Sequence, residues 1–162
     1  RGILKTGKQD DRIVFLNRLQ EKTPDIKFDI YGINKVQPIW ADHYFKTISN
    51  AKMGLNLSRG EAIKYYSSDR ITQIVGNGLV CLIDEKTSYR DFFSDTEMVF
   101  YKNENDLSEK ILKISRDEKL RKSIAKKGKN KYMKYFNSTL VAKFILEKTL
   151  GIKSKNKYFW HN

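Results

Sequence analysis

The chain has 162 residues, of which 40% are hydrophobic and 31% are charged, and its formal net charge is +13. This length allows one domain with a real core, and the hydrophobic content argues against intrinsic disorder. One cysteine, Cys81, excludes a disulfide framework, and no apolar run approaches the roughly 20 residues that span a bilayer. We therefore expect a cytoplasmic protein that at most contacts the inner face of a membrane peripherally.

The positive charge is concentrated in the C-terminal third of the chain. Residues 1–107 carry 16 Lys and Arg against 15 Asp and Glu, whereas residues 108–162 carry 16 against 4. A basic segment of this kind contacts phosphates of lipid headgroups, nucleotides or nucleic acid, or it reflects only a Lys-rich composition. Composition alone leaves these alternatives open.

Apolar periodicity predicts alternating helices and strands from residue 10 onward. A first helix is expected between Asp10 or Asp11 and Pro24, because Ile13, Leu16 and Leu19 share one face and proline stops the helix. The following elements are a strand at 26–32, a helix at 41–52, a strand at 53–60, a short helix at 70–78, a strand at 79–84, one or two helical turns at 88–94 and a strand at 97–101. Three helices end the chain, at 106–117, 118–136 and 138–150, the last with a Ser/Thr cap.

This order predicts a doubly wound α/β domain, a Rossmann-like three-layer sandwich with helices on both faces of a parallel sheet. Only four strands are expected, and the usual first strand with its glycine-rich turn is missing, so we expect a domain truncated at its N-terminus. We divide the chain into a Rossmann-like domain at 1–150 and a basic, aromatic tail at 151–162 that packs on something else.

Ligands of an open parallel sheet bind at the carboxyl ends of its strands. Three polar segments are expected to meet there: NLSRGE at 56–61, YYSSDR at 65–70 and DEKTS at 84–88. Ser67, Ser68 and Asp69 are good N-cap residues, which either satisfy free helix amides or help to hold an anion such as a diphosphate. Arg70 places a cation in the first helical turn, which is unfavourable to the helix dipole and therefore indicates a ligand. Arg59 flanks the same loop and is placed to assist.

The remaining chemistry-bearing residues support no other site. The sequence GNG, from Gly76 to Gly78, predicts a helix C-cap with left-handed residues. His43 and His161 lack partners for a metal site, and Cys81 is expected to be buried and inert. No GxSxG, Walker A or GxGxxG motif is present, so no catalytic residue is assigned.

The stretch YYSSDRITQIVGNGLVCLIDEKTSYRDFFSDTEMVFYKNENDLSEKI resembles the C-terminal, donor-binding domain of GT-B glycosyltransferases, and the likeness extends over about residues 10–150. The closest likeness is to the group 1 or CgeB-like subgroup, in which Arg-x-Phe-Glu-x-x-Ala-Cys-Gly precedes an apolar strand and an aspartate. Arg70 falls on the motif arginine and Gly78 on the motif glycine. Gln73 stands where the family has a glutamate that binds the donor's ribose, and an amide still hydrogen-bonds a diol without charge.

The resemblance implies that Ser67, Ser68, Asp69 and Arg70 hold the diphosphate of a nucleotide sugar, with Gln73 at the ribose and with Arg59 and Gly78 in support. It implies a metal-independent hexosyltransferase without a cofactor. The partners would be the nucleotide sugar, a separate N-terminal GT-B domain that commonly supplies the catalytic base, and a glycan or lipid-linked acceptor of bacterial surface-glycan synthesis. Alone, the chain would transfer little or nothing. Tyr101, Asn103 and Asp106 match the family's final strand-to-helix step, which is structural.

Two other functions stay open. A non-catalytic Rossmann-like scaffold is favoured by the departure at Gln73. A nucleic-acid-binding module would depend on the basic C-terminal helices and predicts steep salt dependence. No recognised nucleic-acid motif supports the second function, so nucleic acid is the less expected partner.

Overall fold

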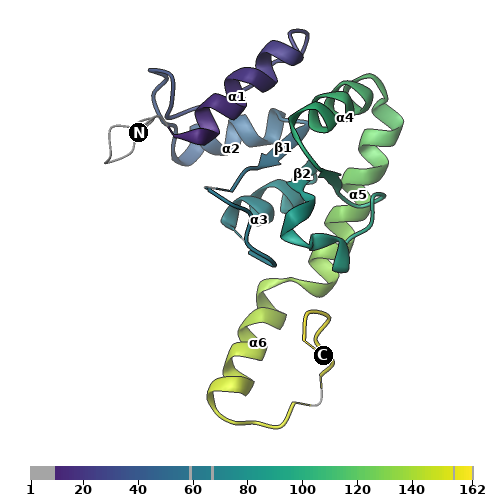
Figure 1. Cartoon of the computed structure of the whole chain (residues 1–162). Coiled ribbons are helices and arrows are strands. Elements are labelled where there is room, and N and C mark those ends of the chain that lie inside the picture. The colour runs from purple at the N-terminus through teal and green to yellow at the C-terminus, as the bar shows by residue number, and fades with distance from the viewer. Residues whose placement is uncertain (1–9, 59, 67, 155, 162) are drawn as a thin grey trace.

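The computed structural model describes residues 10–58, 60–66, 68–154 and 156–161. Its centre is a parallel sheet of three strands in the order β1-β2-β3, with helices on both faces (Figure 1). The strands are β1 (Met53–Asn56), β2 (Val80–Asp84) and β3 (Val99–Tyr101). The helices are α1 (Asp11–Lys22), α2 (Ala41–Asn50), α3 (Asp69–Gly76), α4 (Glu104–Arg116), α5 (Glu118–Tyr135) and α6 (Ser138–Thr149), with short 3-10 helices η1 (Glu85–Thr87) and η2 (Tyr89–Asp91). The predicted α/β, Rossmann-like arrangement is confirmed.

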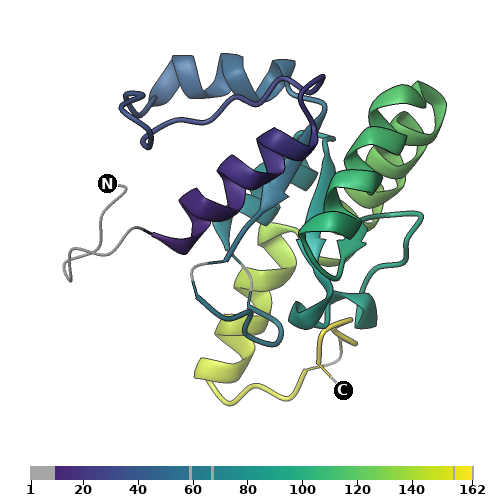
Figure 2. The same ribbon diagram turned by 45° about the horizontal axis from the view of Figure 1, so that its top comes forward.

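The central strand β2 contributes to two cores. Cys81 and Ile83 point into a core closed by α3 and α5, whereas Val80 and Leu82 point into a core closed by α1 and α4. Figure 2 shows α1 lying across one face of the sheet. An unbroken apolar run is what a parallel strand covered on both faces requires. Burial also raises the pKa of the Cys81 thiol to about 12, so the thiol stays neutral, as an inert core cysteine should.

The predicted strand at 26–32 is wrong, because no described residue of this segment pairs with another strand. Ile26 and Phe28 are half-buried and pack on the core beneath α1 and α4. Their alternation therefore reflects an extended segment that buries one side without joining the ladder. The described part of the sheet has three strands and not the four that the sequence predicts.

Helix ends follow local rules. Side chains cap the N-termini of α1, α4, α5 and α6. The cap of α6 is Asn137 and not the predicted Ser138 or Thr139, because the Asn137 side chain accepts a hydrogen bond of 3.0 Å from the amide of Leu140. At the end of α3, Gly78 adopts φ +77°, and the amide of Leu79 donates to the carbonyl of Ile74 at 3.0 Å. This is the Schellman motif that a glycine permits. Within the GNG sequence, Gly78 has the predicted left-handed conformation, whereas Asn77 has φ −81°.

Helices α2 and α6 lie at the periphery, and neither contains a buried residue. In Figure 1, α6 extends away from the sheet and the C-terminal tail runs back beside it. Phe144 of α6 contacts Tyr158 of the tail with ring centroids 4.9 Å apart, and Phe159 stacks on Tyr135 at 4.7 Å. The tail therefore packs on its own chain, where the sequence indicated contact with something else. Within the described residues, no helix is both long and apolar enough to cross a membrane.

Candidate functional site at the carboxyl edge of the sheet

Described residues of all three polar segments meet at the carboxyl edge of the sheet, as predicted. At the end of β1, Asn56 is 2% exposed and accepts a hydrogen bond of 2.8 Å from the hydroxyl of Ser68. Tyr65 donates its amide to the carbonyl of Thr87 at 2.9 Å and its hydroxyl to Asp91 at 2.5 Å. These contacts tie the loop before α3 to the ends of both β1 and β2, so the N-terminus of α3 lies at this edge.

The N-terminus of α3 presents polar groups outward. Ser68 holds the N-cap position, but its hydroxyl bonds Asn56 and makes no capping bond, so its predicted capping role is not observed. Arg70 is exposed, and it forms no ion pair among the described residues. Gln73 lies one turn later on the same side, because residues three apart share a helix face. The opposite side of α3 is buried through Ile71, Ile74 and Val75.

Two of the predicted site residues, Ser67 and Arg59, lie outside the described part of the chain. The structure therefore brings together Ser68, Asp69, Arg70 and Gln73 on one short helix. Gly78 lies at the other end of that helix and shapes its C-cap.

A pocket of about 560 Å³ opens at the same edge of the sheet, between the ends of the strands and the start of α1. None of the predicted site residues that are described lines it. Asn56 connects the pocket to α3, because its neighbour Leu57 lines the pocket while its side chain holds Ser68. The lining residues come from α1, from the loop after β1 and from the ends of β2 and β3: Asp11, Arg12, Phe15, Leu57, Ser58, Gly60, Glu61, Ala62, Asp84, Lys86, Tyr101, Lys102 and Asn103.

The pocket has two cations available to a ligand. Lys86 and Lys102 are exposed and form no ion pair among the described residues, whereas Arg12 is paired with Asp10 at 2.6 Å. Burial raises the pKa of Tyr101 well above its usual range, with the negative charge of Asp84 adding to the effect, so this hydroxyl stays protonated. The pocket therefore combines two free ammonium groups, a neutral phenol and carboxylates.

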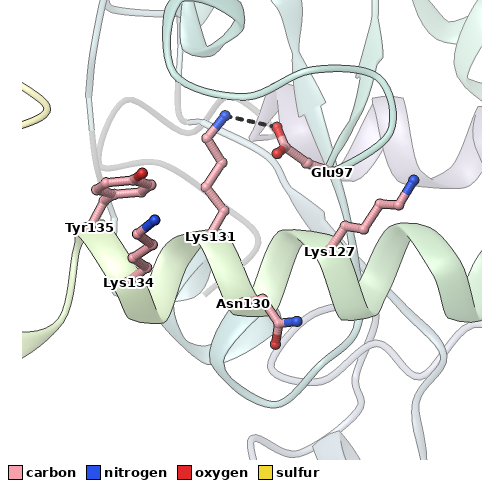
Figure 3. Close-up of a pocket in the computed structure, with 6 residues that line it drawn as sticks. All are labelled: Glu97, Lys127, Asn130, Lys131, Lys134 and Tyr135. Atoms are coloured by element: carbon pink, nitrogen blue, oxygen red, sulfur yellow. Dashed lines mark hydrogen bonds and ion pairs between the residues drawn. The ribbon is translucent and has the colours of Figure 1, made fainter.

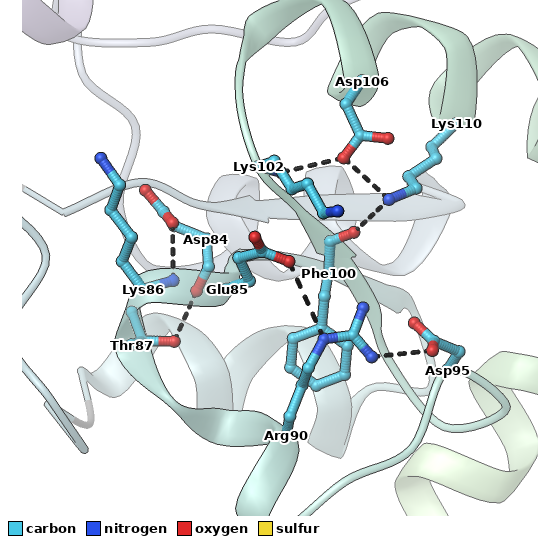
Figure 4. A network of polar contacts seen from close by, with 10 residues as sticks. All are labelled: Asp84, Glu85, Lys86, Thr87, Arg90, Asp95, Phe100, Lys102, Asp106 and Lys110. Carbon is cyan, nitrogen blue, oxygen red and sulfur yellow. Dashed lines mark hydrogen bonds and ion pairs between the residues drawn. The ribbon is translucent and has the colours of Figure 1, made fainter.

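Other charges beside β2 and β3 are already neutralised (Figure 4). Arg90 pairs with Asp95 at 2.7 Å and lies over the ring of Phe100 at 4.4 Å. Lys110 bonds Asp106 at 2.8 Å and the carbonyl of Phe100 at 2.7 Å. These contacts order the strand-to-helix step and leave few unpaired charged groups for a ligand.

The step from β3 to α4 has the structural role that was predicted for Asn103 and Asp106. Asn103 caps α4 by accepting from the amide of Asp106 at 3.0 Å, and Asp106 accepts from the amide of Lys102 at 2.9 Å. Burial alone would raise the pKa of Asp106, but the bonds from Lys110 and the Lys102 amide outweigh burial and lower it.

Sequence reasoning missed the lysines of the pocket. Lys86 follows the end of β2 by two residues and Lys102 directly follows β3. The same strand-end rule that selected the loop after β1 therefore pointed to both positions. The sequence did not predict that α1 contributes to the pocket, because no local pattern around Asp11 or Phe15 indicates that the start of α1 lies against the end of β3.

A second pocket, of about 380 Å³, lies along α5 near the start of β3 (Figure 3). Lys131 points across it to Glu97, with Nζ and Oε2 2.9 Å apart. It contains no predicted site residue. Across the described residues, no group of three or more His, Cys, Asp and Glu side chains is placed to hold a metal ion.

A family model described as glycosyl transferase-like matches residues 12–147, which run from α1 through α6 and include both cores and the whole carboxyl edge of the sheet. The chain belongs to this glycosyl transferase-like family. The predicted class is therefore confirmed at the level of the family, and membership supports a role in glycosyl transfer in general. No curated protein and no solved structure matches the chain.

Proposed function

We propose that this chain is the donor-binding half of a GT-B glycosyltransferase of the CgeB-like subgroup, and that it binds a nucleotide-diphosphate sugar at the N-terminus of α3. The observation that carries this proposal is the hydrogen bond from Ser68 to the buried Asn56. It fixes the start of α3 at the carboxyl edge of a parallel sheet, where such folds bind ligands. Membership in the glycosyl transferase-like family supports the choice of ligand.

The diphosphate would lie against the first turn of α3. The first amides of a helix have no intrahelical acceptor, and the helix dipole makes this end attractive to an anion. Because the Ser68 side chain does not cap α3, a ligand oxygen is free to take that place. Arg70 adds a permanent charge one residue into the helix, Asp69 begins the same turn, and Ser67 would add its hydroxyl from just before it in the sequence.

Gln73 would hydrogen-bond the ribose hydroxyls. It is half-buried and lies one turn beyond Arg70 on the same side of α3, so both side chains reach one extended ligand. Arg59, which lies between β1 and α3 in the sequence, would support the site, and Gly78 would support it by ending α3 where β2 must begin.

Transfer itself would need a second, N-terminal domain that binds the acceptor and supplies the catalytic base. We propose a hexosyl transfer without metal or cofactor, to a glycan or lipid-linked acceptor in the synthesis of bacterial surface glycans. Positive groups such as Arg70 would stabilise the leaving diphosphate. The isolated chain is then expected to bind the donor weakly and to transfer little.

The test is a thermal-shift series of the whole chain with UDP, GDP, ADP, CMP and dTDP. A ligand at tenfold its Kd stabilises the folded state by about 1.4 kcal/mol, which is a readable shift in Tm. We expect one nucleotide to raise Tm and Arg70→Ala to abolish most of the shift. The matched control is Arg116→Ala, which removes an exposed arginine from the last turn of α4 and should keep the shift.

A second variant distinguishes nucleotide binding at the N-terminus of α3 from binding in the pocket beside α1. Lys102→Ala removes a cation from the pocket beside α1 and leaves α3 unchanged. A shift that persists in Arg70→Ala and disappears in Lys102→Ala would move the nucleotide to that pocket and contradict the assignment to α3. No shift with any nucleotide would favour a scaffold without donor binding.

A further inference from the structure

One face of α6 is apolar and exposed, with lysines along its borders. Val141, Ile145 and Leu146 are 38%, 56% and 59% exposed, and the residues just after the helix continue the surface with Leu150 at 66% and Ile152 at 55%. We call these five residues the α6 apolar face. In a helix of 3.6 residues per turn, Val141 and Ile145 lie one above the other and Leu146 lies beside them.

The other side of α6 is held by the C-terminal tail, so the orientation of the α6 apolar face is defined. Phe144 contacts the rings of Tyr158 and Trp160 at 4.9 and 6.0 Å. Glu147 accepts hydrogen bonds from the hydroxyl of Tyr158 at 2.7 Å and from Asn156 at 2.9 Å. Since these groups lie on the tail side, the apolar side chains are left on the outside.

The charge around this face has one sign. Helical spacing places Lys143 and Lys148 on opposite borders of the α6 apolar face, and both are exposed. Lys153 and Lys157 follow in the tail. Between residues 119 and 161, the described part of the chain contains one acidic residue, Glu147, whose carboxylate is engaged by the tail. The outer surface of α6 therefore combines aliphatic groups with cations and presents no competing carboxylate.

We propose that the α6 apolar face is a docking surface for an anionic phospholipid bilayer. An amphipathic helix with aliphatic residues on one face and lysines at its borders lies in the plane of the interface, with the lysine heads in the headgroup layer. A nucleic acid would satisfy the lysines but offers no apolar layer for Ile145 and Leu146. A protein partner would need an acidic rim matched to these lysines, whereas an anionic membrane supplies both features over its whole surface.

The test is flotation of the whole chain with two kinds of vesicle, pure phosphatidylcholine and phosphatidylcholine with roughly one-third phosphatidylglycerol. We expect the chain to float with the anionic vesicles, to bind the neutral vesicles about tenfold more weakly, and to be released as salt is raised. The double variant Ile145→Asp, Leu146→Asp should lose about tenfold or more in vesicle binding, because two aliphatic side chains no longer enter the bilayer. Lys143→Glu with Lys148→Glu should lose binding only to the anionic vesicles.

A matched control distinguishes membrane binding by the α6 apolar face from nonspecific adsorption of any exposed apolar residue. Phe45→Asp alters an exposed apolar residue, 60% exposed, on α2, another helix without buried residues. It should leave vesicle binding unchanged, and circular dichroism should show all variants folded. Flotation of the Ile145→Asp, Leu146→Asp variant at the wild-type level would overturn the proposal. So would a chain that ignores vesicles and instead forms dimers that this double variant dissociates in sedimentation equilibrium, since the face would then join two copies.

Discussion

Glu97 and Lys131 tie the turn before β3 to α5. Their side chains are only 18% and 23% exposed, and Glu97 also accepts from the backbone amide and the hydroxyl of Ser94. Burial alone would raise the pKa of Glu97, but the Ser94 bonds and the Lys131 pair outweigh it and lower the pKa below its ordinary value of 4.5. A group whose pKa is lowered by folding stabilises the fold above its unfolded pKa and loses that contribution as pH falls through the folded pKa.

We therefore expect Glu97→Gln to lower the free energy of unfolding by about 1–2 kcal/mol at pH 7. The difference from wild type should shrink as the pH falls below 4.5 and through the lowered folded-state pKa of Glu97. Urea denaturation at several pH values measures it. The control is Glu118→Gln, whose partner Lys122 lies one turn away on an exposed surface. A similar loss in the Glu118→Gln variant, or a Glu97→Gln loss that is independent of pH, would contradict this account.

Among the secondary-structure elements, α5 shows a conflict between helix propensity and packing. Gly128 lies in the interior of this helix, where alanine is intrinsically the better residue by about 1 kcal/mol. A Cβ at this position would fall on the carbonyl oxygen of Glu97, which is backbone and has little room to move. The glycine is therefore required by the close approach of α5 to the turn before β3.

Gly128→Ala is expected to destabilise the protein by about 1–3 kcal/mol, the reverse of the sign that propensity predicts, because the clash forces the helix away from the sheet. Chemical denaturation compares it with Lys126→Ala, an exposed change on the same helix that should stay within about 0.5 kcal/mol. A stabilised Gly128→Ala protein would show that the helix and the turn separate easily.

Over the whole molecule, burial is distributed unevenly. The strand β2 is fully buried over Val80–Ile83, while α2 and α6 contain no buried residue. Trp40, the N-cap residue of α2, is 70% exposed. Local opening requires the least free energy where few apolar groups are buried, so the stability of this fold should fall from β2 outward.

Hydrogen exchange should resolve this gradient. We expect the amides of β2 to exchange only through global unfolding and those of α2 to exchange at least about a hundredfold faster, through local opening. Mass spectrometry of peptic fragments covering 41–50 and 80–84 provides the comparison. Equal protection of both fragments would show that α2 is coupled to the core more tightly than its exposure indicates.

The sequence by itself determined the order of helices and strands except at 26–32, the two-sided burial of β2 and the meeting of the polar segments at the carboxyl edge. These features depend on local signals: apolar periodicity, capping residues such as Asp10, and the glycine at 78. The same signals failed at 26–32, because alternation of apolar and polar residues indicates that one side of a segment is buried but does not indicate that another strand pairs with it. The family resemblance also pointed to Arg70 and Gln73, and their role in binding stays a prediction.

Only the tertiary structure decided which residues share the pocket beside α1 and which charges are already paired. Phe15 and Lys102 lie far apart in the chain and line one pocket because α1 packs next to α4 and therefore next to the end of β3. Arg90 is as basic as Lys86 and Lys102 in sequence, and only folding places the carboxylate of Asp95 and the ring of Phe100 against it. Residues that are distant in the sequence come together because whole faces of helices and strands pack, and no local sequence pattern predicts which of them will meet.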